Sequence, residues 1–145
     1  MKQYDPHMHT AEHVLNQTMV KMFGCERSFS NHLERKKSKC DYRFQRALTE
    51  SEEREVESRV NEVLAQQLPV EMEMMTRAEA ARHFDLERLP DASGEEIRIV
   101  KVGDYDACPC IGDHVENTKE VGSFVFGSSS FDEGVLRIRF KLKRG

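Results

Sequence analysis

The segment MHTAEHVL (residues 8–15) carries two histidines four positions apart, and CPCIGDHV (residues 108–115) carries a cysteine and a histidine with the same spacing. Side chains at positions i and i+4 of a helix share one face, so the two histidines can approach one point. If the fold brings the second segment to that point, three imidazoles and one thiolate form a tetrahedral set that suits zinc best among common metals. The expected ligands are His9, His13, Cys110 and His114.

Either pair alone is a weak signal, because this spacing also arises by chance. Both pairs in one chain of 145 residues, with residue types that match a four-ligand zinc site, favour metal binding. The first segment also has the HxxEH pattern of inverted zinc proteases, with Glu12 as the general base. Such proteases need a further acidic ligand and a much larger body, so this interpretation is the less favoured one.

Composition indicates one folded domain over residues 1–145, with 38% hydrophobic and 33% charged residues. The net charge of -4 argues against nonspecific binding to DNA, but it leaves room for a local basic patch. The sequence has no apolar run near about 18 residues and no apolar N-terminal stretch, so we expect no membrane span, no secretion and a cytoplasmic location. The four cysteines are then expected to be free thiols or metal ligands.

Hydrophobic periodicity predicts an α+β fold in which a mostly antiparallel sheet packs against helices. Helices are expected where apolar residues recur at helical spacing or a capping box opens the segment, over residues 8–23, 50–67 and 77–84. Strands are expected where apolar and polar residues alternate, over residues 27–33, 40–46, 70–75, 95–103, 121–127 and 136–143. Irregular structure is expected over residues 104–115 and 127–134, and around Pro90, Ser93 and Gly94.

Two groups of basic residues stand out in a chain that is acidic overall. One lies in the turn between the first two predicted strands, and the other alternates with the apolar residues of the last strand. Each group is more simply a solvated surface, but each could also contact the phosphates of a nucleic acid. The residues concerned are Arg35, Lys36, Lys37 and Lys39 in the turn, and Arg137, Arg139 and Lys141 in the strand.

HTAEHVL, residues 9–15, is similar to the first motif of the editing domain of alanyl-tRNA synthetase, which runs roughly HTAxHLL. CIGDHVENTKEVGSF, residues 110–124, resembles the second motif, roughly CGGTHVxxTxxIGxF. Residues 46–80 look like the helix, strand and short helix of the same family. The resemblance extends over nearly the whole chain. It includes the free-standing AlaX proteins and, in the HxxxH and CxxxH framework, the editing domain of threonyl-tRNA synthetase.

The resemblance implies a two-layer domain that holds zinc through the four residues named above and hydrolyses mischarged tRNA. Relatives of this kind remove serine or glycine from alanine tRNA, and the threonyl relative removes serine from threonine tRNA. Because no aminoacylation domain is recognisable, we expect a deacylase that acts in trans, with basic residues holding the acceptor-stem phosphates. A zinc-containing module that binds tRNA or protein without catalysis is the main alternative.

The chain departs from the family pattern CGGTH at two positions, where Ile111 replaces a glycine and Asp113 replaces a threonine. Asp113 could orient a ligand imidazole through its carboxylate, and it joins Glu12 as a candidate catalytic residue. Cys108 is an additional thiol that could compete with Cys110 as a ligand. These departures leave open which amino acid is removed.

Overall fold

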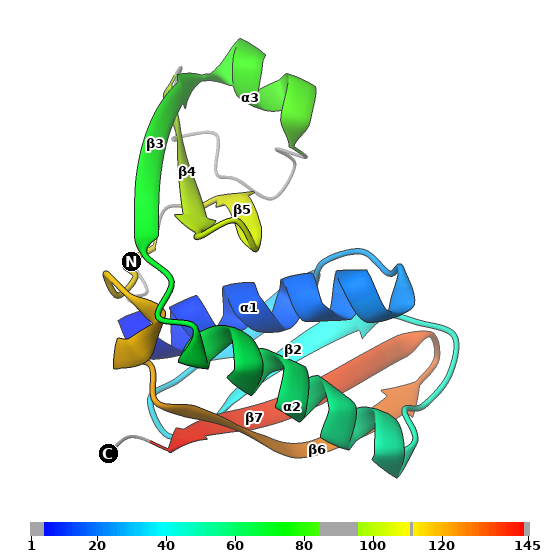
Figure 1. Ribbon diagram of the computed structural model, residues 1–145. Coiled ribbons are helices and arrows are strands. Elements are labelled where there is room, and N and C mark those ends of the chain that lie inside the picture. The colour runs from blue at the N-terminus through cyan, green and yellow to red at the C-terminus, as the bar shows by residue number, and fades with distance from the viewer. Residues whose placement is uncertain (1–4, 85–95, 111, 144–145) are drawn as a thin grey trace.

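A computed structural model describes residues 5–84, 96–110 and 112–143. The predicted fold class is confirmed, because these residues form an α+β fold of helices and antiparallel sheets (Figure 1). The strands form two sheets rather than one. The larger sheet has the order β1 (Ser30–Leu33), β2 (Ser38–Arg43), β7 (Val135–Lys143) and β6 (Ser123–Asp132). The smaller sheet has the order β3 (Val70–Thr76), β4 (Glu96–Val102) and β5 (Asp106–Pro109).

Two helices, α1 (Pro6–Phe23) and α2 (Glu50–Ala65), cover one face of the larger sheet (Figure 1). The strands of this sheet are β1 (Ser30–Leu33), β2 (Ser38–Arg43), β6 (Ser123–Asp132) and β7 (Val135–Lys143). Every second residue of β7 faces the helices, and the buried residues of that strand are Leu136, Ile138 and Phe140. With apolar residues of both helices, they form the main core, whose burial stabilises the two layers.

Helix α3 packs on one face of the smaller sheet, where a second, small core contains Ala80, Ile97 and Ile99. In Figure 1 this sheet stands above α1 and α2. Val102 belongs to the main core, so the two sheets meet where β4 ends. No helix within the described ranges is long and apolar enough to cross a membrane. The elements of this part are β3 (Val70–Thr76), α3 (Arg77–His83), β4 (Glu96–Val102) and β5 (Asp106–Pro109), followed by the short helix η2 (Thr118–Glu120).

The structure differs from the sequence prediction at four strands. β2 covers Ser38–Arg43 rather than residues 40–46, so it begins two residues earlier and ends three residues earlier than predicted. β5 lies within residues 104–115, which periodicity predicts to be irregular, because a strand of four residues is too short to show alternation. β6 continues to Asp132 through most of the predicted loop, since a bulge at Gly127 lets it keep pairing with β7. β1 begins only at Ser30. The loop predicted around Pro90, Ser93 and Gly94 lies outside the described residues.

Capping residues set the two ends of α1 and therefore the position of its histidines. The Asp5 side chain accepts hydrogen bonds from the backbone N–H groups of His7 and Met8 (3.0 and 3.1 Å). These N–H groups lie in the first turn, where no carbonyl group of the helix is available as an acceptor. Gly24 ends the helix as predicted, in the left-handed conformation with φ 69°. His9 donates its backbone N–H to the Asp5 carbonyl (2.9 Å), so it lies in the first turn.

The start of α2 is expected to stabilise the fold in a pH-dependent way. Thr49 and Glu52 form a capping box, and Arg46 donates two hydrogen bonds to the Glu52 carboxylate (2.8 and 2.9 Å). The hydrogen bond from Arg46, followed by that from Thr49, lowers the pKa of Glu52 from 4.5 to about 2. A carboxyl group whose pKa is lower in the folded state stabilises that state at pH values above its ordinary pKa of 4.5. This stabilisation is lost as the pH falls from 4.5 toward about 2.

Glu52→Gln should therefore lower the free energy of unfolding near neutral pH, and its difference from the parent protein should shrink as the pH falls through that window. Because Arg46 is the largest cause of the shift, the effect of Glu52→Gln should also be smaller in an Arg46→Met background. Urea unfolding over a pH series measures both effects. A difference that stays constant down to pH values near 2 would contradict this account.

Candidate metal centre

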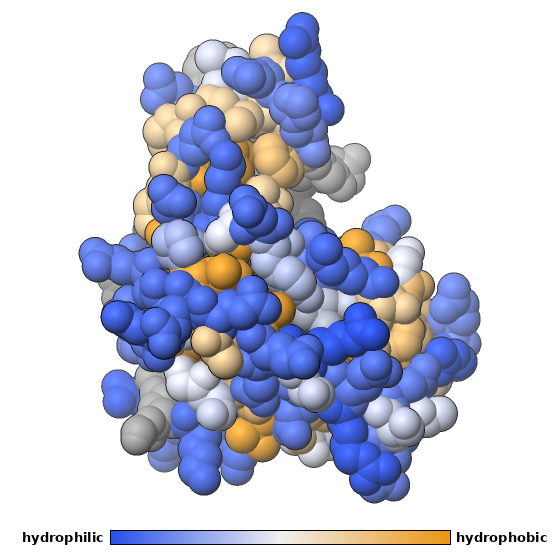
Figure 2. Space-filling model, viewed as in Figure 1, coloured by the Kyte–Doolittle hydropathy of each residue, from blue (hydrophilic) through white to orange (hydrophobic). Residues whose placement is uncertain are grey.

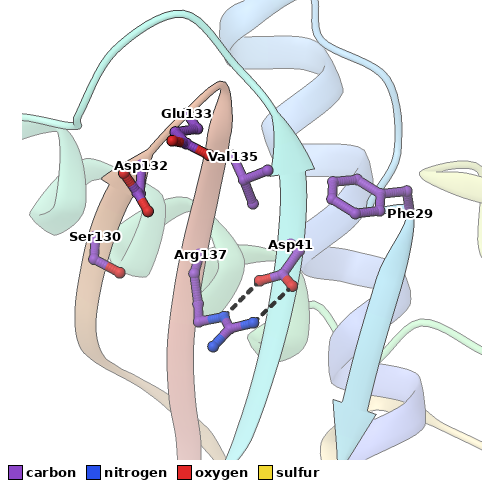
Figure 3. Close-up of a pocket in the computed structure, with 7 residues that line it drawn as sticks. All are labelled: Phe29, Asp41, Ser130, Asp132, Glu133, Val135 and Arg137. Atoms are coloured by element: carbon purple, nitrogen blue, oxygen red, sulfur yellow. Dashed lines mark hydrogen bonds and ion pairs between the residues drawn. The ribbon is translucent and has the colours of Figure 1, made fainter.

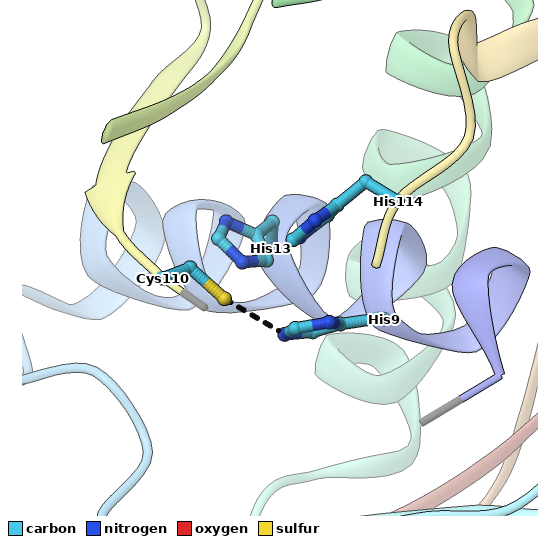
Figure 4. Close-up of side chains that lie close together, drawn as sticks. All are labelled: His9, His13, Cys110 and His114. Atoms are coloured by element: carbon cyan, nitrogen blue, oxygen red, sulfur yellow. Dashed lines mark hydrogen bonds between the residues drawn. The ribbon is translucent and has the colours of Figure 1, made fainter. Parts of the chain in front are cut away.

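The four expected ligands lie together, although Cys110 and His9 are 101 positions apart in the chain. Cys110 and His114 lie in the loop after β5, and this loop reaches the first turns of α1, which carry His9 and His13 (Figure 4). The donor atoms of the four side chains all lie within 4.8 Å of one another. Cys110 Sγ is 3.1 Å from His9 Nε2, and the rings of His9 and His114 stack with centroids 4.1 Å apart.

Each imidazole is oriented by an oxygen atom at its outer nitrogen. His9 Nδ1 lies 3.2 Å from the Asp113 carbonyl oxygen, and His114 Nδ1 lies 3.0 Å from the Gly112 carbonyl oxygen. His13 Nδ1 lies 3.2 Å from a buried carboxylate. Because these oxygens accept hydrogen bonds, each Nδ1 carries a proton, and each Nε2 is left to donate a proton to the thiolate or, once that proton is lost, to bind a cation. Three Nε2 atoms beside a thiol are the arrangement of metal-ligating histidines whose outer nitrogens are held by oxygen.

Burial and charge at the cluster fit a divalent cation. Burial alone would raise the pKa of the Cys110 thiol, but hydrogen bonds from the three imidazoles outweigh it and lower the pKa to about 3, so the sulfur is a thiolate at neutral pH. The side chains of Glu12 and Asp106 are also buried beside the cluster, and the guanidinium groups of Arg27 and Arg98 lie nearby. Burial lowers the pKa of the His13 ring, but the charge of Glu12 and the hydrogen bonds to Asp106 and Cys110 outweigh it and raise this pKa well above 6.5. A divalent ion at the cluster would therefore displace a proton from this ring.

Asp106, at the start of β5, holds His13 in place. Its side chain is 1% exposed, its Oδ2 lies 3.2 Å from His13 Nδ1, and Arg27 donates to both of its oxygens (2.7 and 3.3 Å). These contacts fix the orientation of the His13 ring and raise the basicity of its Nε2. Sequence analysis missed both Asp106 and Arg27. The position of Asp106, four residues before Cys110 and therefore at the same parity along the strand, is a signal that could have indicated it.

The loop that carries Cys110 and His114 is fixed by a side chain from β4 and by close packing on α1. Arg98 donates hydrogen bonds to the carbonyl oxygens of Cys110 (2.9 Å) and Gly112. Gly112 lies so close to the His9 ring that a Cβ at this position would overlap the ring. A glycine is therefore required here for space, and this glycine is the one that CIGDH shares with the family pattern CGGTH.

Glu12 lies between the two histidines of α1, with its carboxylate buried beside the cluster. Its Oε2 is 3.8 Å from His13 Nε2, and its Oε1 accepts a hydrogen bond from Asn31 (2.9 Å). No residue in the described part of the chain donates a hydrogen bond to Oε2. A buried carboxylate oxygen without a donor is unfavourable, so this atom is suited to a partner that binds at the cluster.

The remaining candidates in the loop have different roles from those expected. The Asp113 side chain is exposed, and this residue holds His9 through its backbone carbonyl rather than its carboxylate. Cys108 is partly buried on β5 and is not one of the four clustered ligands. Ile111 lies outside the described residues.

The basic residues lie on other surfaces of the molecule. Those of the predicted turn are exposed at the tip of the β1–β2 hairpin, and the others project from the face of the larger sheet that is turned away from the helices. On that outer face, Lys39 lies directly opposite Arg139. The tip residues are Arg35, Lys36 and Lys37, and the outer-face residues are Lys39, Arg137, Arg139 and Lys141.

Arg137 is held by a carboxylate on the neighbouring strand. It donates two hydrogen bonds to Asp41 (2.8 and 3.0 Å), as Figure 3 shows. The pair borders a depression of about 500 Å³ that Asp132 and Glu133 also line. Because carboxylates surround it, this depression is unsuited to a phosphate group.

Known proteins provide an independent test of the family. Residues 97–139, from β4 to β7, match the family described as the threonyl and alanyl tRNA synthetase second additional domain. The chain is 33% identical over 132 residues to the alanine–tRNA ligase of Fervidobacterium nodosum. It is 31% identical over 136 residues to that of Methanopyrus kandleri and 32% identical over 143 residues to that of Treponema denticola. These matches cover 90%, 91% and 93% of this chain, but only 15%, 15% and 23% of the relatives.

The fold and the matched segment define a class of small α+β domains associated with aminoacyl-tRNA synthetases. Within that class, the chain is similar over about nine tenths of its length to one segment of alanine–tRNA ligases, as the sequence motifs predict.

Gly112→Ala should weaken the binding of an added divalent metal ion, for which zinc is the probe, by about 10-fold or more, because the added methyl group displaces the ring of His9. In a His9→Ala background the same change should have little further effect, since the methyl group then has room. Competition with a colorimetric zinc chelator measures the affinity of all four proteins. If the losses of zinc affinity caused by Gly112→Ala and His9→Ala simply add in the double variant, the overlap with His9 is not the cause of the loss in Gly112→Ala.

Asp106→Asn should weaken the binding of an added divalent metal ion, again probed with zinc, by about 10- to 100-fold, because it removes the charge that orients His13 while preserving the shape of the side chain. Asp104→Asn, an exposed position in the preceding turn, is the matched control and should bind zinc like the parent protein. The same competition titration applies, with circular dichroism to show that the fold is retained. Equal zinc affinity in the two variants would remove Asp106 from the site.

Proposed function

We propose that this protein is a zinc-dependent deacylase that removes an amino acid wrongly esterified to tRNA, acting in trans, with serine or glycine on alanine tRNA as the first candidates. The observation that carries the proposal is the convergence of three imidazole Nε2 atoms and one thiolate on one point. The similarity to alanine–tRNA ligases supports tRNA as the partner. That substrate would place the protein in the cytoplasm.

Zinc would be held by Nε2 of the three histidines and by the Cys110 thiolate. This donor set of nitrogen and sulfur suits zinc better than it suits magnesium or calcium, which prefer oxygen. When bound, such an ion supplies Lewis acidity toward a carbonyl oxygen or an amino group of the substrate.

We assign proton transfer to Glu12. Of the two carboxylates buried beside the cluster, Asp106 is occupied by His13 and Arg27, whereas Glu12 has one oxygen that accepts no hydrogen bond from the described residues. Asn31 fixes the other oxygen and so sets the direction of the free one. Water would attack the ester carbonyl carbon and give a proton to Glu12, and the ribose oxygen would leave with that proton as its bond to the carbonyl carbon breaks.

The tip of the β1–β2 hairpin would contact the acceptor stem. The Ser28 N–H donates to Asn16 and the Asn31 side chain donates to Glu12, so β1 runs toward the start of α1, where the cluster lies. The tip residues Arg35, Lys36 and Lys37 follow directly and would contact backbone phosphates near the ester. The outer-face residues Lys39, Arg139 and Lys141 would contact phosphates farther from it.

A zinc-containing module that binds tRNA without catalysis is the second candidate, and one observation favours it. All four ligands face one point, and four protein ligands close the tetrahedral shell of a structural zinc. The protease interpretation of HTAEH has less support, because Cys110 and His114 complete the ligand set where an acidic residue would be needed.

The test is deacylation by the zinc-loaded protein of three charged tRNAs, Ser-tRNA(Ala), Gly-tRNA(Ala) and Ser-tRNA(Thr). We expect at least one ester to be cleaved well above its rate without protein. Cys110→Ala should lose zinc and cleavage together, because it removes the thiolate ligand. Glu12→Gln should keep zinc and lose cleavage by about 100-fold or more, because it removes the proton acceptor.

The matched control is Cys25→Ala, which removes a partly buried thiol outside the cluster and should leave cleavage unchanged. Zinc-loaded protein that binds these tRNAs but leaves all three esters intact would establish the noncatalytic module instead. Cleavage of peptides rather than esters would favour the protease. Full activity in Glu12→Gln would remove Glu12 from the reaction without removing the deacylase.

A further inference from the structure

Two exposed methionines lie on the smaller sheet. Met72 and Met74 on β3 are 52% and 55% exposed, and they are the large hydrophobic side chains exposed in the described part of the chain. Figure 2 shows apolar atoms gathered among charged ones on the surface over the smaller sheet. Two neighbouring apolar side chains that face water add little to the buried core, so they indicate a surface that binds a ligand.

The strand register places both methionines on the sheet face that carries the cysteine ligand. Met74 pairs with Arg98, and the Arg98 carbonyl accepts the backbone N–H of Cys110 (3.1 Å), which continues the ladder. Met72 pairs with Val100, one row away on the same face. Paired residues of antiparallel strands project to the same side. Because neighbouring strands are about 4.8 Å apart, the methionines begin roughly 10 Å from the cysteine.

Arg98 connects the methionines to the cluster. Its Nη1 lies 3.6 Å from the sulfur of Met72, and its Nε donates to the carbonyl oxygen of Cys110 (2.9 Å). The guanidinium therefore lies between the apolar pair and the loop that carries two of the ligands. A ligand that covered the methionines would pass over Arg98 on its way to the cluster.

We propose that Met72, Met74 and Arg98 form the subsite for the terminal nucleoside of the substrate, with the base lying on the methionines. This inference rests on the proposed function, because the ester and the base are attached to the same ribose and must be bound a short distance apart. Methionine side chains are polarisable and make favourable contacts with aromatic rings. A guanidinium beside them adds cation–π attraction to a base and charge attraction to the adjoining phosphate.

The charges around the methionines favour a nucleotide over a second copy of the chain. Glu71 and Glu73 alternate with the methionines and project from the opposite face of β3. Arg98 supplies a cationic group on the methionine side, and this charge complements a nucleotide. β3 is an edge strand, and two carboxylates on such a strand oppose its pairing with an identical strand.

The test is calorimetric binding of 3′-deoxy-3′-(L-serylamino)adenosine, an amide that resists ester hydrolysis, to the zinc-loaded protein. The double variant Met72→Ser, Met74→Ser should bind this compound about 5- to 150-fold more weakly than the parent protein, because the base loses its stacking surface. A second compound that keeps the serylamino ribose but lacks the base should bind the two proteins equally. Glu71→Ser, on the opposite face of the same strand, is the matched control and should bind both compounds like the parent.

Equal binding of the adenosine compound to the parent and the double variant would overturn the subsite even if tRNA is deacylated. Base-dependent binding that is lost in the double variant would support the subsite even if no ester is cleaved, so the two proposals fail separately. Light scattering provides the remaining check. A protein that is dimeric as the parent and monomeric as the double variant would show that the methionines join two copies, which would also overturn the subsite.

Discussion

The contact between the first turns of α1 and the loop after β5 is the constraint on which the rest of the structure depends. It gathers a thiolate, two carboxyl groups, three imidazoles and the guanidinium of Arg27, and buried charges are tolerated only when matching partners surround them. Side chains from distant segments of the chain meet this requirement. The contact between α1 and the loop after β5 therefore fixes where the two sheets lie. The cost of closing so long a loop grows slowly with its length, which makes such a remote contact affordable.

The meeting of His9, His13, Cys110 and His114 could be predicted from the sequence, because spacing along a helix or a loop is a local property. Their supporting partners could not, because they meet only in the fold. Arg27 and Asp106 are 79 positions apart, and nothing in either segment alone shows that they will pair. The backbone carbonyl of Asp113, rather than its carboxylate, orients the ring of His9. Because every residue has a backbone carbonyl, the residue type could not indicate this contact. A glycine is required at position 112 because of its contact with the His9 ring, and the sequence alone does not show that contact.

For the strands too, local patterns could be predicted from the sequence, whereas contacts between distant segments could not. Alternation predicts β7 well, because one face is buried and the other is basic. It fails for the end of β6, where serines stand on both faces and the bulge at Gly127 shifts the pattern by one residue. Alternation also gives no information about which strands pair, so it predicts strands without showing that they divide into two sheets.

The small core of Ala80, Ile97 and Ile99 is separate from the main core, and the two parts meet near the end of β4 and at the ligand loop. An ion bound between His9 and Cys110 would therefore tie one part to the other, and part of its binding free energy would go into docking the smaller sheet. The supply of metal in the cell would then govern how freely the smaller sheet moves. Under metal starvation that sheet would loosen first, while the larger one kept its packing.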